Sequence, residues 1–89
     1  MLPGAYAVEA MAQTADLLLL TLERYRGMDP LLAEIRRASF RTPVPPGSTL
    51  ALSATLLSER EGLGLAVCRC QAYLDGIPAA EAELVLALR

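Results

Sequence analysis

The sequence contains no histidine, and this absence bears first on its two cysteines. Cys68 and Cys70 have no imidazole to activate a thiol, so a catalytic cysteine is not expected. The two residues stand two apart in a strand-like segment, where both side chains would share one face without the geometry for a mutual disulfide. We therefore expect reduced thiols that fill a core, in a protein of the cytoplasm.

Lysine is also absent, so arginine supplies all of the positive charge. Eight arginines stand against ten carboxylates, for a net charge of -2, and no basic run occurs. This balance argues against nucleic acid as a partner.

The apolar N-terminus has no positively charged start, and Glu9 and Asp16 interrupt it before the short run Leu17–Leu20. We therefore expect neither a signal peptide nor a membrane span, and we expect no metal and no cofactor.

Apolar residues, in contrast, are plentiful. They make up 54% of the 89 residues, and the mean hydropathy is positive. A chain of this length forms a single domain, residues 1–89, and folding removes only roughly 60 to 65% of its surface from water. So small a domain has difficulty burying this much apolar material, and we expect a homodimer or a higher oligomer.

The most secure element is a helix over Ala5–Leu22. The segment is rich in helix-forming residues and has no internal glycine or proline, and Pro3-Gly4 stands where a helix would begin. On a helix of this period the polar residues fall in one narrow stripe, and the rest of the helix surface is apolar. We therefore expect the helix to be wrapped on several sides. The stripe contains Glu9, Gln13, Asp16, Glu23 and Arg24.

The second half of the chain reads as strands. Alternating apolar residues predict strands over Thr49–Ser58, Leu63–Leu74 and Ala79–Leu88, with Asp75-Gly76 as a hairpin turn between the last two. Leu31–Thr42 is ambiguous, because its composition favours helix whereas its end alternates and runs into a proline-rich turn. A helix followed by an antiparallel meander predicts an α+β fold in which the sheet packs on the helix.

Three segments carry a resemblance to a known family. Leu2–Gln13 has a proline-glycine opening followed by an E-A-hydrophobic-A-Q core, Ala38–Gly47 has the form A-x-F-x-x-P-V-x-P-G, and Tyr73–Gly76 is followed by Ala80–Ala82. Together they resemble the β-hydroxyacyl-acyl-carrier-protein dehydratases. The resemblance implies a hotdog fold, in which an antiparallel sheet wraps one long central helix, and it implies that Leu31–Thr42 is a strand.

The resemblance does not extend to the front of the family's domain. In the family, two strands and a loop with a catalytic histidine precede the residues that match Leu2–Gly4, whereas here Met1 stands directly before Leu2. We therefore expect about four strands, without the family's first two. Either the chain is a natural minimal form, or its true start lies upstream.

The resemblance also assigns the site residues. Glu9 matches the family's catalytic carboxylate, although periodicity alone would place it in a solvated stripe. The backbone N–H groups near Pro3 and Gly4 would polarise the thioester carbonyl, and Gln13 would contact the substrate. In the family, the histidine of the other subunit completes the site, and the acyl tunnel follows the dimer interface.

Three functions are open on this basis. The first is a dehydratase-like lyase, inactive unless a histidine comes from an upstream segment or from a homologous subunit. The second is a thioesterase that uses Glu9 alone, and the third is a non-catalytic acyl-binding subunit. The substrate would be a thioester of acyl-carrier protein or of coenzyme A. The group Arg36, Arg37 and Arg41 is either a solvated strand face or a contact for that carrier.

Overall fold

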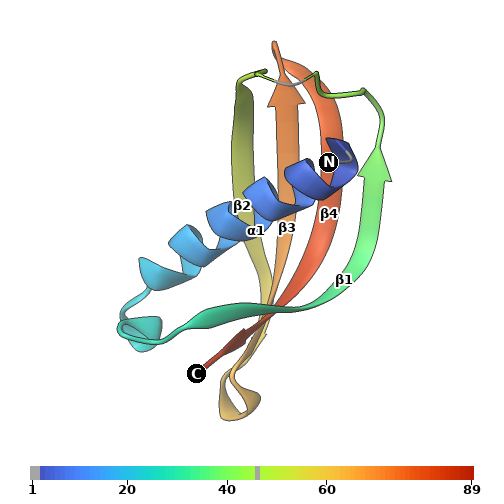
Figure 1. Cartoon of the computed structure of the whole chain (residues 1–89). Coiled ribbons are helices and arrows are strands. Elements are labelled where there is room, and N and C mark those ends of the chain that lie inside the picture. The colour runs from blue at the N-terminus through green and yellow to red at the C-terminus, as the bar shows by residue number, and fades with distance from the viewer. Residues whose placement is uncertain (1–2, 46) are drawn as a thin grey trace.

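The structure, a computed structural model, describes residues 3–45 and 47–89. Within these residues one α-helix precedes a four-stranded antiparallel sheet, as the hotdog prediction requires (Figure 1). The elements are α1 (Pro3–Leu20), η1 (Glu23–Tyr25), β1 (Pro30–Phe40), β2 (Leu50–Arg60), η2 (Glu61–Leu63), β3 (Leu65–Leu74) and β4 (Ile77–Leu88). The ambiguous segment 31–42 is a strand for most of its length, so sheet pairing overrides its helical composition.

The strand order corrects the expected meander. The order is β1-β4-β3-β2, so only β2, β3 and β4 follow one another as hairpins, and β1 pairs with β4. Asp75 and Gly76 have φ values of 51° and 79°, as a tight hairpin between β3 and β4 requires. The connection from β1 to β2 is longer, because it comprises residues 41–49. The described part of this proline-rich segment crosses the end of the sheet, where β1 and β2 are separated by three strand spacings or roughly 14 Å.

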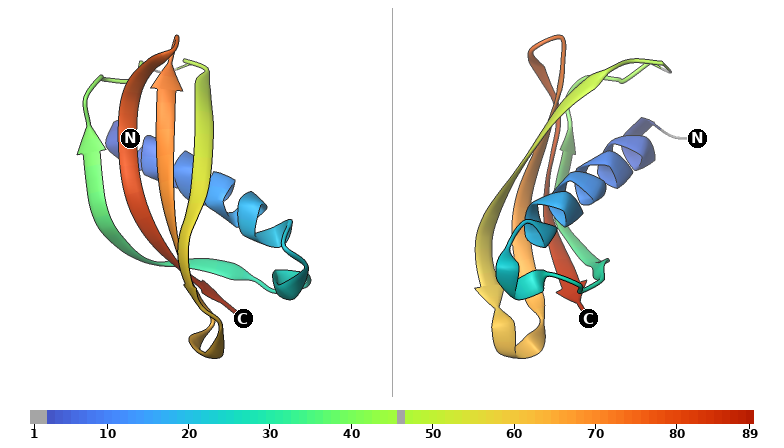
Figure 2. Two further views of the ribbon diagram at one scale, coloured as in Figure 1. Left: turned by 180° about the vertical axis from the view of Figure 1, so that it is seen from behind. Right: turned by 90° about the vertical axis from the view of Figure 1, so that its left-hand side faces the viewer.

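The helix packs on one face of the curved sheet (Figure 2). Its buried residues recur every fourth position and lie against the inner side chains of β3 and β4. They are Ala7, Met11, Ala15 and Leu19. The opposite face stays open, with Leu17 68% exposed, so a single chain does not wrap the helix on several sides as expected.

Both cysteines lie in this core. Cys68 and Cys70 are free thiols on the inner face of β3, and both are fully buried. Burial raises the pKa of Cys68 to about 11 and that of Cys70 to about 12. A thiol that stays protonated at neutral pH is a poor nucleophile, so the prediction of core-filling cysteines is confirmed.

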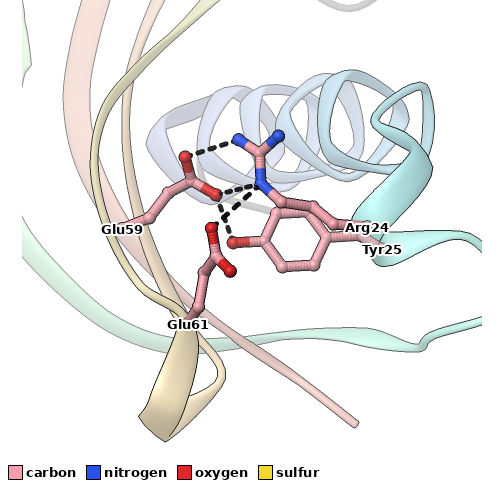
Figure 3. A network of polar contacts seen from close by, with 4 residues as sticks. All are labelled: Arg24, Tyr25, Glu59 and Glu61. Carbon is pink, nitrogen blue, oxygen red and sulfur yellow. Dashed lines mark hydrogen bonds and ion pairs between the residues drawn. The ribbon is translucent and has the colours of Figure 1, made fainter.

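A polar cluster fixes the chain where it leaves the helix (Figure 3). Arg24 donates from Nε to Glu59 Oε1 at 2.7 Å and from a terminal nitrogen to Glu59 Oε2 at 2.5 Å. The buried Tyr25 donates its hydroxyl to the same carboxylate, and the Arg24 guanidinium lies 5.2 Å from the centre of the Tyr25 ring. This cluster ties η1 to the end of β2. Glu23 and Arg24 thus leave the helical stripe in which the sequence placed them, because α1 ends at Leu20.

The cluster makes stability depend on pH. Hydrogen bonds from Arg24 and then Tyr25 lower the pKa of Glu59 below its ordinary value of 4.5. A lowered folded-state pKa contributes stability that is complete above the unfolded pKa and is lost as the pH falls through the folded value. We expect Glu59→Gln to lower the urea midpoint at neutral pH, and we expect the difference from wild type to shrink as the pH falls below about 4.5.

Glu61→Gln is the matched control. Glu61 lies 3.6 Å from Arg24 Nε and its side chain is 69% exposed, so its loss should leave the midpoint nearly unchanged. A Glu59→Gln deficit of the same size at neutral and acidic pH would contradict the assignment.

Candidate active site

The predicted site residues lie along the open face and the first turn of α1. Glu9 and Gln13 are both exposed, one turn apart and facing away from the sheet. Pro3 and Gly4 form the first turn of the helix, where backbone N–H groups have no partner within the helix. Gly4 and Glu9 are separated by roughly 8 Å along the helix axis. The expectation that Glu9 faces an apolar cavity between subunits concerns a second chain and stays a prediction.

A cavity opens beside the N-terminal half of α1. Its volume is about 360 Å³, and it lies between the helix, the end of β1 and the start of β4. The lining residues are Ala7, Phe40, Arg41, Thr42, Pro43, Val44, Ala79 and Ala80. Of the described residues that line it, only Arg41 and Thr42 bring polar side chains, so the cavity suits an apolar ligand group. Ala7 stands two residues before Glu9, and side chains two apart on a helix point to opposite faces, so the cavity and the Glu9 carboxylate lie on opposite sides of the same helical turns.

One sequence motif could have predicted which residues line this cavity. The segment A-x-F-x-x-P-V supplied evidence for the family, yet none of its residues was assigned to the site. Five of the residues that line the cavity, Phe40, Arg41, Thr42, Pro43 and Val44, come from this segment. The proline-rich segment that connects β1 to β2, at the opposite edge of the sheet, therefore also lines the cavity.

The inner side of β1 is apolar and uncovered. Leu32, Ile35 and Phe40 lie opposite Leu86, Leu84 and Ala80, which belong to the buried core. Directly opposite side chains share a face of the sheet, so all three β1 residues point to the helix side. They are nevertheless 41%, 45% and 51% exposed. This uncovered strip adjoins the cavity through Phe40.

Asp16 occupies an unusual position on the helix. Its side chain is half-buried, and within the part of the chain that the structure describes its Oδ1 is buried without a hydrogen-bond partner. Desolvation raises the pKa of Asp16. One buried carboxylate oxygen without a hydrogen-bond partner does not identify a reaction. Asp16 also matches no residue that the family resemblance assigns to the site.

The arginine group divides in two. Arg36 forms an ion pair with Glu34 at 3.2 Å, as expected of a solvated strand face. Arg37 and Arg41 instead border a cavity of about 200 Å³ on the outer face of the sheet, together with Arg69 of β3, which the sequence did not single out. Arg69 was missed because it is distant in sequence and reaches this position only through the strand order.

Within residues 3–45 and 47–89, the cysteine and carboxylate side chains form no group suited to holding a metal ion. None of the helices in these residues combines the length and apolar character needed to span a bilayer.

Comparison with known proteins confirms the family resemblance. The model of the FabA-like domain matches residues 1–83. The chain is 42% identical over 85 residues to the 3-hydroxyacyl-acyl-carrier-protein dehydratase FabZ of Latilactobacillus sakei, with 93% of this chain and 58% of the relative covered. The FabZ of Polynucleobacter necessarius is 42% identical over 89 residues, with 100% and 58% covered. For the FabZ of Clostridium beijerinckii the values are 35% over 88 residues, 99% and 61%. The chain therefore spans about 60% of the length of these curated relatives.

Proposed function

The chain belongs to the FabA-like domain family, and from this premise we propose that it is an acyl-thioester-binding subunit of the 3-hydroxyacyl-acyl-carrier-protein dehydratase type. The observation that carries the proposal is the apolar cavity beside the N-terminal half of α1. The helix that lines it bears Glu9 on the opposite, open face, and the cavity walls come from the segment that the family motif marks. An acyl chain would occupy the cavity, and the thioester would reach past the N-terminal turns of α1 to the open face, where Glu9 lies.

The chemistry sets the requirement for a second group. Dehydration of a 3-hydroxyacyl thioester removes a proton from the α-carbon and protonates the departing hydroxyl, so water leaves and a trans-2-enoyl thioester forms. Glu9 can serve one of these proton transfers. N–H groups of the first turn, at and after Gly4, would stabilise negative charge on the thioester oxygen. The 89 residues contain no histidine, so on this proposal the family's second acid-base group comes from another segment or subunit.

We place a partner subunit at β1, as a second copy or a histidine-bearing homologue. β1 is an edge strand, and Leu32, Ile35 and Phe40 form an apolar strip beside it that the single chain leaves exposed. The pairing of β1 with β4 shifts register near Ala33 and Arg36. Regular hydrogen bonding of β1 to a partner strand would therefore centre on the stretch Arg37–Phe40.

Light scattering at micromolar concentration should show a dimer or larger species, and a monodisperse 9.5 kDa species would contradict this arrangement.

A thioesterase is the second candidate. It needs only one carboxylate as base or nucleophile, and Glu9 is the acid-base residue that the resemblance assigns to this chain. Release of free thiol from an acyl thioester, without formation of an enoyl product, would select this reaction.

Thioester binding tests the proposal independently of turnover. Calorimetric titration of octanoyl-pantetheine should show saturable binding, and Phe40→Ala should weaken it about tenfold, because part of an aromatic contact with the acyl chain is lost. Leu63→Ala is the matched control, since Leu63 is 69% exposed in η2 and does not line the cavity. Absence of binding to wild type, or equal binding to both variants, would overturn the assignment of the cavity.

A further inference from the structure

The sheet has a second free edge at β2. In the strand order β1-β4-β3-β2, β2 pairs with β3 on one side, and no other strand of the described residues pairs with it. The stretch Leu50–Leu56, here named the β2 edge, pairs with β3 residue by residue, and the register shifts only after Leu56. Edge strands are commonly protected from association by charged residues, prolines or bulges. The β2 edge contains none of these, so backbone N–H and C=O groups along it are available to another strand.

The helix side of the β2 edge is apolar and incompletely covered. Leu52 and Ala54 lie opposite Ala72 and Cys70, which belong to the buried core. The inner side chains of the β2 edge pack against that core but remain half-buried. The last turns of α1 extend past β2 (Figure 1), so a strand added at this edge would lie under that part of the helix. Such a strand would remove further apolar surface from water, which favours association.

The β2 edge matches itself when it is paired antiparallel with a second copy. With Ser53 at the centre, each residue meets one that faces the same side of the sheet. On the helix side leucine meets leucine or alanine, and on the outer side small uncharged residues meet. No like charges are opposed, so the pairing carries no electrostatic penalty. The pairs are Leu50 with Leu56, Ala51 with Thr55, Leu52 with Ala54, and Ser53 with Ser53 of the second copy.

We propose that the β2 edge is an interface between two copies of this chain, related by a two-fold axis that passes through the sheet at Ser53. The self-matching pattern favours a second copy over an unrelated strand, because a two-fold axis requires each residue to suit its counterpart. The inference goes beyond the proposed function and does not depend on the acyl cavity. Since β1 and β2 are opposite edges of the sheet, a partner at both edges would build assemblies larger than a dimer.

A cysteine at the centre of the β2 edge tests the contact directly. The Cα atoms of two opposed residues in an antiparallel pair lie about 4.5 to 5.5 Å apart, a separation that a disulfide can bridge. Ser53 is exposed. On mild oxidation, Ser53→Cys should therefore convert most of the protein to covalent dimers, measured by non-reducing electrophoresis.

Two controls show whether the cross-link depends on this register. Gln71 lies beside Ser53 on β3, and its two copies would be three strand spacings or roughly 14 Å apart across the interface. Gln71→Cys should therefore form no covalent dimer. Wild type should form none either, because Cys68 and Cys70 are both buried.

Light scattering provides an independent measurement. Ser53→Arg opposes two like charges at the axis and should at least halve the molar mass relative to wild type. Gln71→Arg makes the same change in net charge on the neighbouring strand and should keep the wild-type mass. The far-ultraviolet circular dichroism of Ser53→Arg should equal that of wild type, because position 53 is exposed.

The outcomes separate the two edges of the sheet. Absence of the covalent dimer in Ser53→Cys, or a molar mass of Ser53→Arg equal to that of wild type, would overturn the proposal and leave the β2 edge to a strand of another protein. A monomeric Ser53→Arg variant would support the interface at β2 but contradict the partner placed at β1.

Discussion

Purified alone, the 89-residue chain is expected to hydrate a trans-2-enoyl thioester at least two orders of magnitude more slowly than the complete FabZ of Latilactobacillus sakei. One carboxylate cannot both exchange the α-proton and activate water at the β-carbon from the opposite side. Loss of one of two acid-base groups typically costs roughly two to four orders of magnitude in rate. The measurement is the decay of the enoyl thioester absorbance at equal protein concentrations.

The two cysteine thiols and the Tyr25 hydroxyl offer no substitute for the missing imidazole. Burial holds the pKa of Cys68 at about 11 and that of Cys70 at about 12, far from the values at which a group exchanges protons near neutral pH. Burial also raises the pKa of Tyr25, whose hydroxyl is bonded to Glu59. Turnover by the chain alone at a rate comparable to that of the relative, abolished by Glu9→Gln, would show that the requirement for histidine is wrong.

The second large effect concerns the core. Leu84 is fully buried on the inner face of β4, between Ile35 of β1 and Cys68 of β3. Truncation to alanine removes buried methyl groups and leaves a cavity beneath α1. We expect Leu84→Ala to lower the free energy of unfolding by about 2 to 5 kcal/mol, measured by urea titration. Small domains are stable by only roughly 5 to 15 kcal/mol, so a substantial unfolded fraction is expected at 37 °C.

Leu63→Ala removes the same groups from a side chain that is 69% exposed. It should change the unfolding free energy by no more than about 0.5 kcal/mol. Equal destabilisation by the two substitutions would contradict the placement of Leu84 at the centre of the core.

Much of the fold follows from local sequence patterns. Alternation over 49–58, 63–74 and 79–88 places β2, β3 and β4 within a few residues of their observed bounds. Asp75-Gly76 correctly predicts the hairpin between β3 and β4, because few other residue pairs adopt positive φ at both positions without strain. The sequence also predicts which face of each of these strands is buried, because one face of each is apolar.

The features that depend on tertiary pairing were less accessible. The composition of β1 favours helix, and the family motif rather than propensity identified it as a strand. Its position beside β4 depends on the crossing segment, for which no tight-turn signal exists. The end of α1 at Leu20 depends on the bonds that Arg24 and Tyr25 form with Glu59, which lies more than 30 residues away. Helical periodicity cannot detect such a partner.

The candidate site shows the same difference between what local motifs predict and what depends on tertiary pairing. Glu9 was found through its motif, since its position on a polar stripe has an ordinary solvated explanation. The cavity walls and the position of Arg69 beside Arg37 and Arg41 follow from the strand order, which brings 37–41, 69 and 79–83 onto adjoining strands. The likeness to FabZ covers nearly all of this chain, and the single-chain geometry adds the cavity to which the motif belongs.

A mixed oligomer tests most directly whether Glu9 forms one half of a dehydratase site. The relative from Latilactobacillus sakei is prepared with its carboxylate at the position of Glu9 replaced by an amide, so that it retains histidine but lacks the other group. Mixed with this chain, it should recover enoyl thioester hydration at least a hundredfold above either protein alone, and Glu9→Gln in this chain should abolish the recovery. Co-elution of the two proteins without recovered hydration, or recovery that survives Glu9→Gln, would contradict the account.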